Sequence, residues 1–219
     1  VPSVVRYRGH TEDPWTLTTE YVPTARTKWG KGDIQDALNT CASVRDALNA
    51  LNGHEHVFAR HEASVHAGLT VLTGKLRKRV KAAVTALAEI PVSELTVQHC
   101  DTRLENWVLS AHGPVLLDFG VAALAPRGWD EAVLVANHSQ LSERALRRLL
   151  RKGHVNAELM YLAAGLQTAL AAHALTSPNP GHVTWASTYL PVLGRAMRVA
   201  RKFTKDPAPA PEPSKEIAV

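Results

Sequence analysis

The chain has 219 residues, and with 45% hydrophobic and 21% charged residues it has the composition of a globular protein with a sizeable core. A formal net charge of +5 is compatible with an anionic ligand but does not identify one. Cys41 and Cys100 lack the close spacing of a metal-binding pair, so we expect free thiols, although their number also allows one disulfide.

Residues 1–23 are predicted to form β-structure. The runs SVVRYR and WTLTTEYV are rich in β-branched and aromatic residues, and GHTEDP between them carries turn-forming Gly, Asp and Pro. This pattern predicts a hairpin, which PTARTKWGKG follows as a connecting loop. The start of the chain contains no apolar core of the kind that signal peptides have, so we expect a cytoplasmic protein.

A first helix is expected from Asp33, a suitable N-cap, to about Asn52, with Gly53 as its stop. Its apolar residues recur three or four apart and form one stripe: Ile34, Leu38, Cys41, Val44, Leu48 and Leu51.

Two further helices are expected before residue 90, one containing ASVHAGLTVL and one from about Lys75 to Glu89. The second has a basic face, which we interpret as solvated: Lys75, Arg77, Lys78, Arg79 and Lys81. Four histidines cluster in sequence without the spacing of a zinc motif, so we favour surface or packing roles for them: His54, His56, His61 and His66.

Short apolar runs predict strands at 95–99 and 106–110, and GPVLLDFG supplies a turn followed by another strand. Residues 106–118 are therefore predicted to form a β-hairpin in the middle of the helices.

Beyond Trp129 the pattern is helical, over about 130–138, 142–152, 155–175 and 184–203, with Gly153 as a C-cap. The uncharged run LMYLAAGLQTALAAHAL is shorter than a membrane span and contains a Gln and a His, so it predicts a buried core helix. We expect no membrane partner, and a disordered Pro/Ala-rich tail at 206–219.

Polar residues flank the predicted hairpin in a pattern that suits phosphoryl transfer. Taken alone, Asp101 and Asn106 would be ordinary turn formers. Transfer needs Mg²⁺, a carboxylate near the attacking hydroxyl, and donors to the γ-phosphate. Asn106 and Asp118 offer the hard oxygen ligands that Mg²⁺ prefers, from opposite ends of the hairpin. Asp101 is available to accept a proton, and Arg103 to offer a guanidinium to the phosphate.

The pattern His99-x-Asp101-x-x-x-x-Asn106, followed by Asp118-Phe-Gly, resembles the catalytic loop and metal motif of the protein-kinase-like superfamily. The resemblance implies that Asp101 is the catalytic base and that Asn106 and Asp118 hold Mg²⁺. It also implies that His99 supports the loop structurally.

Protein kinases follow this motif with a long activation segment, whereas VAALAPRGWDEAVLV leads almost directly into a helix. That is similar to the aminoglycoside phosphotransferase and choline kinase-like branch. Gly128 and Asp130 match the pattern of this branch, in which Asp130 would tie the helix start to the catalytic loop. Gly120 is more typical of protein kinases.

The resemblance implies an α+β, protein-kinase-like fold: a mainly helical C-lobe with an inserted β-hairpin and a partial β N-lobe. The expected boundaries are 1–23 for the partial N-lobe and hinge, 24–205 for the C-lobe, and 206–219 for the tail. WTLTTEYVP resembles the strand that enters the hinge of this family, so the backbone at Glu20, Tyr21 and Val22 would hold the adenine of ATP, with GTP as an alternative donor.

The family's phosphate-covering loop, Lys-bearing strand and partner Glu helix have no counterpart in the sequence before the hinge. We therefore expect a fragment of a longer enzyme, or else a partner chain or segment that completes the N-lobe. A degenerate, non-catalytic fold is the third alternative, but the presence of Asp101, Asn106 and Asp118 argues against it.

Residues 132–205 contain two acids and ten Lys or Arg, which suits a polycationic aminoglycoside poorly. The arginines at 144, 147, 148 and 151 are interpreted as a solvated stripe. We expect an ATP-dependent phosphotransferase acting on a hydroxyl of a small molecule such as an antibiotic or metabolite. The alternatives are a peptide Ser/Thr kinase in natural-product biosynthesis and a pseudokinase-like binding module; nucleic acid is not expected as a partner.

Overall fold

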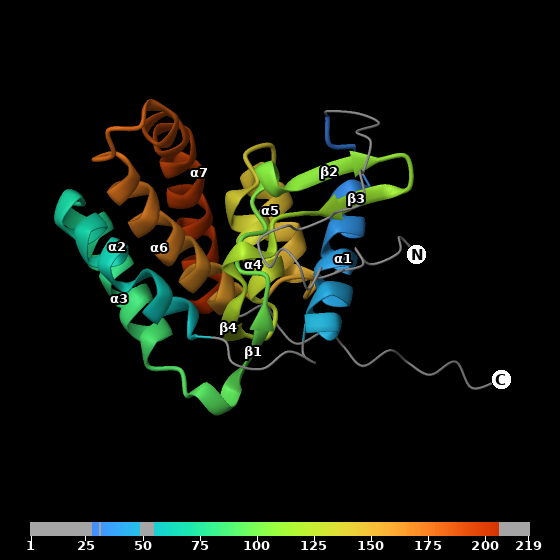
Figure 1. Ribbon diagram of the computed structural model, residues 1–219, viewed down its shortest axis with the longest axis horizontal. Helices are drawn as coiled ribbons and strands as arrows, with labels where there is room; N and C mark the ends of the chain where they lie inside the picture. Colours follow the sequence, from blue (N-terminus) through green and yellow to red (C-terminus); the bar gives the residue numbers. More distant parts are fainter. Residues whose placement is uncertain (1–27, 31, 49–54, 206–219) are drawn as a thin grey trace, which may run out of the picture. The chain divides into compact units, whose positions relative to one another are not determined.

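The computed structural model describes residues 28–30, 32–48 and 55–205 (Figure 1). The predicted N-terminal hairpin, the adenine-binding residues Glu20, Tyr21 and Val22, the expected helix end near Gly53, and the tail lie outside the described residues. The chain divides into two compact units, one within Val1–Arg60 and Ile90–Leu134, the other within His61–Glu89 and Val135–Val219.

The first unit contains helix α1 (Asp33–Leu48), which begins where the sequence predicts. Asp33 is the first helical residue and not the predicted N-cap, and its carboxylate accepts a hydrogen bond from the backbone N–H of Gly30 in the turn before the helix. The predicted stripe is buried at Leu38, Cys41 and Leu48. Helix α1 packs against strands β1 and β3 through this face.

Four short strands complete this unit: β1 (Leu95–Gln98), β2 (Trp107–Ser110), β3 (Gly113–Leu116) and β4 (Ala123–Pro126). Strands β2 and β3 form the predicted antiparallel hairpin, with Trp107 opposite Leu116. Strand β4 pairs antiparallel with β1, with Gln98 opposite Ala123. The sequence analysis missed β4 because its residues, ALAP, carry little β-propensity and end in a proline.

The remaining helices are α2 (Val57–Val71), α3 (Gly74–Ala88), α4 (Trp129–Asn137), α5 (Glu143–Arg151), α6 (Ala157–Ala174) and α7 (Pro180–Lys205). All correspond to predicted helices. Helix α7 starts earlier than expected because Asn179 accepts from the N–H of Gly181 at 2.8 Å and Pro180 suits the first helical position. Gly153 has a φ of +68°, as a helix stop requires.

Helix α6 lies at the centre of the second unit and packs against α3 and α7 (Figure 1). Most of its residues are buried, which confirms the prediction of a core helix. Among the described residues, no helix has the length and apolar character needed to cross a membrane. The described residues thus form a mainly helical α+β structure in which the β2–β3 hairpin is inserted between α3 and α4, as predicted.

Candidate functional site

The β2–β3 hairpin brings the two predicted metal ligands to one end. Asn106 directly precedes β2, and Asp118 follows β3 after one residue. The first cross-strand pair is Trp107 with Leu116, and the N–H of Leu117 donates to the carbonyl of Asn106 at 2.8 Å. The chain therefore enters and leaves the hairpin side by side, with both oxygen-bearing residues beside the junction.

The loop from Asp101 to Asn106 is closed by its own side chains. The amide Nδ2 of Asn106 donates to the carbonyl of Asp101 at 2.8 Å, and the indole of Trp107 donates to the carbonyl of Thr102 at 3.1 Å. Because the Asn106 nitrogen is used in this bond, its Oδ1 is the amide atom suited to a cation.

Arg103 forms a two-point ion pair with Asp101. Its Nη2 donates to one carboxylate oxygen at 2.7 Å, and its Nε donates to the other. The Asp101 side chain is 15% exposed, so this pair is only partly open to solvent. Bidentate pairs of this kind are the strongest that arginine makes with a carboxylate.

Asp118 is an exposed carboxylate on a left-handed backbone, with a φ of 57°. Its Oδ1 accepts from the N–H of Gly120 at 3.3 Å, which caps a short 3₁₀ turn, Phe119–Val121. The left-handed region is unfavourable for residues other than glycine, although Asp is among those that tolerate it best. Strained residues of this kind cluster at functional sites.

His99 joins the two Asp-bearing segments from a buried position. Its Nε2 lies 2.8 Å from the carbonyl of Leu117, and its Nδ1 accepts from the N–H of Asp101 at 3.2 Å. These partners place the ring proton on Nε2. Burial lowers the pKa of His99 below its ordinary value, so the neutral ring fits both bonds. The ring also meets Phe119 edge-on, with centroids 4.6 Å apart.

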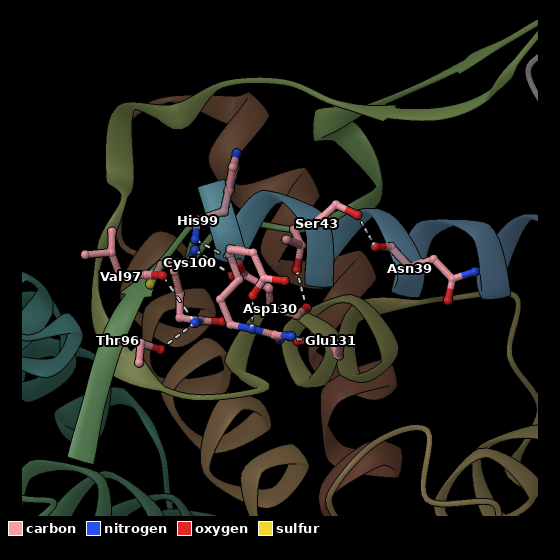
Figure 2. Close-up of polar contacts among 12 residues, drawn as sticks. Asn39, Ser43, Thr96, Val97, His99, Cys100, Asp130 and Glu131 are labelled. Atoms are coloured by element: carbon pink, nitrogen blue, oxygen red, sulfur yellow. Dashed lines mark hydrogen bonds and ion pairs between the residues drawn. The ribbon is translucent and has the colours of Figure 1, made fainter. Parts of the chain in front are cut away.

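Asp130, at the start of α4, holds the beginning of the loop. Its two carboxylate oxygens each accept at 2.8 Å, from the backbone N–H groups of His99 and Cys100 (Figure 2). The hydroxyl of Thr102 donates to the backbone carbonyl of Asp130 at 2.6 Å. Cys100 has a φ of +66°, an unfavourable conformation that these bonds hold in place. Burial raises the pKa of Asp130 to about 7, even though both N–H groups act to lower it.

Sequence reasoning missed several residues that support this site. Thr102 and Cys100 contribute through contacts or backbone geometry that no local pattern indicates. Arg60 donates to the carbonyl of Gly120 at 3.3 Å, and Arg45 pairs with Glu131 at 2.6 Å. A charged residue inside the apolar stripe of α1 was the one available signal for Arg45.

The donors at the hairpin junction fit a small hard cation. Asn106 Oδ1 and the exposed Asp118 carboxylate are oxygens, as Mg²⁺ requires, and water and phosphate oxygens normally complete its shell. Across the described ranges, no three or more His, Cys, Asp or Glu side chains come together as a metal-binding group. Cys41 and Cys100 are both free and buried, as expected.

Comparison with known proteins gives one family and a distant structural match. The model of the phosphotransferase enzyme family matches residues 25–176. Four chains of known structure match; among them is a spectinomycin phosphotransferase in complex with ADP and spectinomycin. That match has 10% sequence identity and a TM-score of 0.42, and it covers 80% of this chain. It spans only 57% of the phosphotransferase chain. No curated protein sequence shows a significant match.

Proposed function

Because the chain belongs to the phosphotransferase enzyme family, we propose that it transfers the γ-phosphate of a nucleoside triphosphate to a hydroxyl group of a small molecule. ATP is the proposed donor, with GTP as the alternative. The observation that carries the proposal is the β2–β3 hairpin, which starts after Asn106 and ends just before Asp118. Two oxygen-bearing residues therefore flank the hairpin junction, beside the loop that carries Asp101.

Asn106 and Asp118 are the proposed ligands of Mg²⁺. The Nδ2 of Asn106 donates to the Asp101 carbonyl, which orients the amide and leaves Oδ1 as the atom that would bind the cation. The strained backbone and exposure of Asp118 are consistent with a ligand held ready for a cation. When bound, Mg²⁺ would neutralise charge on the phosphates.

Asp101 is the proposed base, and Arg103 the proposed ligand of the γ-phosphate. Both carboxylate oxygens of Asp101 accept from Arg103, and the exchange of one of these bonds would free that oxygen to take the proton of a substrate hydroxyl. Phosphate oxygens are suitable replacement partners for a guanidinium. We propose that Arg103 moves from the carboxylate toward the phosphate as the reactants assemble.

The rest of the nucleotide site is proposed from the family relationship. Residues 1–23 would be the partial N-lobe and hinge, with adenine at Glu20, Tyr21 and Val22. Residues 24–205 would be the helical lobe, and 206–219 a tail. A further segment or a partner chain would supply the phosphate-covering loop and the ATP-binding Lys. Within the helical lobe, His99 and Asp130 are proposed to support the loop without touching the reactants.

The proposed acceptor is a neutral or anionic alcohol, such as an antibiotic or metabolite. Residues 132–205 contain ten Lys or Arg and two acids, so a polycationic compound would find few carboxylates there. The same composition suits a peptide Ser or Thr, which is the second candidate.

The test uses the protein from its complete reading frame, with γ-labelled ATP, Mg²⁺, and a panel of neutral, anionic and cationic alcohols and Ser/Thr peptides. Asp101→Asn should lower kcat by about 10²–10⁴-fold, because a positioned base contributes that much. Glu62→Gln, an exposed change on α2, should leave kcat unchanged. Full transfer by the Asp101 variant would exclude the proposed base, and transfer to peptides alone would select the second candidate.

A further inference from the structure

Arg45 is a buried cation in the apolar stripe of α1. The residue is 7% exposed, and it lies among the buried side chains with which α1 covers β1 and β3. Burying a guanidinium is costly unless a charge and hydrogen bonds compensate for it. A buried residue at this position therefore needs a negatively charged partner that offsets the cost of burying its charge.

That partner is Glu131 on α4. Arg45 Nη1 lies 2.6 Å from Glu131 Oε1, and both side chains are close to nine-tenths buried. Asp46, a largely exposed neighbour, lies 3.8 Å from Arg45 Nε. The second oxygen of Glu131 has no hydrogen-bond partner among the described residues, so the pair depends on a single short contact.

Glu131 is adjacent to Asp130, whose carboxylate holds the N–H groups that start the catalytic loop. Figure 2 shows Asp130 and Glu131 from the same turn of α4, with His99 and Cys100 beside the Asp130 carboxylate. The ion pair thus fixes α1 to the turn of α4 that carries the loop support.

We propose that Arg45 is a positioning residue for the catalytic loop, which it reaches through Glu131 and Asp130. Arg45 touches no reacting group. It supplies a positive charge that favours the carboxylate form of the buried Asp130, and it fixes the helix turn from which that carboxylate points. The inference rests on the proposed function only in that the loop is taken to be catalytic.

The charged groups around Asp130 determine the direction in which each substitution should shift its pKa. Two residues of α1, Arg45 and Cys41, lie close enough to interact electrostatically with Asp130. Glu131 of α4 does so too, and the loop contributes the backbone N–H groups of His99 and Cys100. Burial is the main cause of the raised pKa of Asp130; Glu131 raises this pKa further and Arg45 lowers it. Removing either partner breaks the same ion pair, yet the two removals should shift this pKa in opposite directions.

In the ionised carboxylate both oxygens are good acceptors, so each can accept one of the two N–H bonds. In the protonated form one oxygen carries a hydrogen and is a poorer acceptor. As Asp130 takes up a proton, one of the bonds to His99 or Cys100 weakens. The left-handed conformation at Cys100 then loses part of its support, and Asp101 follows immediately in the chain.

The test is an NMR titration of the backbone N–H groups of His99 and Cys100 in the complete protein without ligands, from pH 5 to pH 9. Their shifts should report a midpoint near the Asp130 pKa of about 7. In Arg45→Met the midpoint should move to higher pH, and in Glu131→Gln to lower pH. Arg45→Lys should restore most of the wild-type value, because it returns the charge. Arg147→Met, which removes a surface partner of Glu143, should have no effect.

In transfer assays, the acid limb of the pH profile of kcat should move to higher pH in Arg45→Met and to lower pH in Glu131→Gln. At pH 7, Arg45→Met should lower kcat by a larger factor than it changes KM. Misplacement of a catalytic group by a remote change can cost up to about 10²-fold. Midpoints that move together, or that stay fixed, would overturn the proposal. If Arg45→Met does not fold, Glu131→Gln and Arg45→Lys still decide it. Opposite shifts without any phosphoryl transfer would sink the proposed function and leave this inference standing.

Discussion

The guanidinium of Arg103 lies against the carboxylate of Asp101, with Nη2 2.7 Å from Oδ2 and Nε bonded to Oδ1. The two residues are two positions apart on one loop, and each holds the group that the other is expected to use in the reaction. A residue expected to bind phosphate occupies, in this structure, both oxygens of the expected base. Opening of the pair would leave one of these oxygens free to take a proton from a substrate hydroxyl.

Replacing Arg103 by Lys tests this relationship. A lysine keeps the charge but cannot make the forked contact, because an ammonium group lacks the planar two-point geometry. We expect kcat to fall by about tenfold or more, with a smaller change in KM for ATP, since the interaction with phosphate would be made mainly in the transition state. Steady-state kinetics at saturating Mg²⁺ measure both quantities.

Arg103→Met removes the charge as well and should lower kcat further. Arg77→Lys, on an exposed position of α3, is the matched control. If Arg103→Lys raises KM for ATP while kcat stays constant, Arg103 contributes equally to binding of the ground state and of the transition state, and the proposed exchange is wrong.

Asp118→Gly should separate stability from activity. Glycine adopts the left-handed conformation of residue 118 without the cost that a side chain carries, which is about 1 kcal/mol or more. We therefore expect thermal unfolding at the same or a higher temperature, together with loss of Mg²⁺-dependent transfer. Calorimetry and a Mg²⁺ titration of activity provide the two readouts.

Asp118→Asn serves as the comparison, because Asn also tolerates this backbone but is a weaker cation ligand. It should keep wild-type stability and require more Mg²⁺. A substantial drop in unfolding temperature for Asp118→Gly would show that the carboxylate contact to Gly120 outweighs the backbone strain.

The parts of this site that sequence could predict are those that depend on local order. The hairpin between Asn106 and Asp118 follows from two apolar runs separated by turn-forming residues, so its ends had to meet. The predicted position of the turn was wrong, because Gly113 and Pro114 begin β3 and the turn lies at residues 111–112. The pairing of β4 with β1 joins Ala123 to Gln98, and such non-local contacts leave no periodic signal in a four-residue strand.

The left-handed backbone at Cys100 and Asp118 was also out of reach, because neither residue is a glycine, and at Cys100 the bond that supports it comes from Asp130, 30 residues away. Arg45 illustrates the same limit. A charged residue on the buried face of α1 is unusual, but the partner that explains it lies 86 residues away.

Stability should depend on pH through Asp130. Its pKa is raised from 3.8 to about 7 in the folded protein, so between these values the native state binds more protons than the unfolded state. The contribution of Asp130 to the free energy of unfolding is therefore full at low pH and declines as pH rises toward and through 7. The decline is on the order of 4 kcal/mol, at 1.36 kcal/mol for each pKa unit.

Urea unfolding of the wild type and of Asp130→Asn between pH 4 and pH 8 measures this contribution. It is the difference between the two proteins in how the free energy of unfolding changes with pH. The wild type should lose stability relative to the variant as pH rises, although its loop is better held in the ionised form. Parallel curves would show that Asp130 does not titrate in this range.

Two glycines in the second unit should respond to alanine with opposite signs. A Cβ at Gly165 of α6 would lie 2.4 Å from the Cβ of Ala83 on α3, closer than real contacts allow. At Gly194 of α7, the nearest atom to an added Cβ is Arg198 Nη1 at 3.8 Å, an ordinary contact with the end of a flexible side chain.

Gly165→Ala should force α3 and α6 apart and cost about 1–3 kcal/mol, as overpacking of a core does. Gly194→Ala should stabilise the chain by about 0.4–1 kcal/mol, because alanine favours the helix and restricts the unfolded state. Denaturant unfolding of both variants checks the pair. Helix propensity alone cannot explain opposite changes in stability, because replacing Gly by Ala in a helix interior has a similar propensity effect at both positions. A stabilising Gly165→Ala would show that α3 shifts at little cost, which would contradict the close α3–α6 packing.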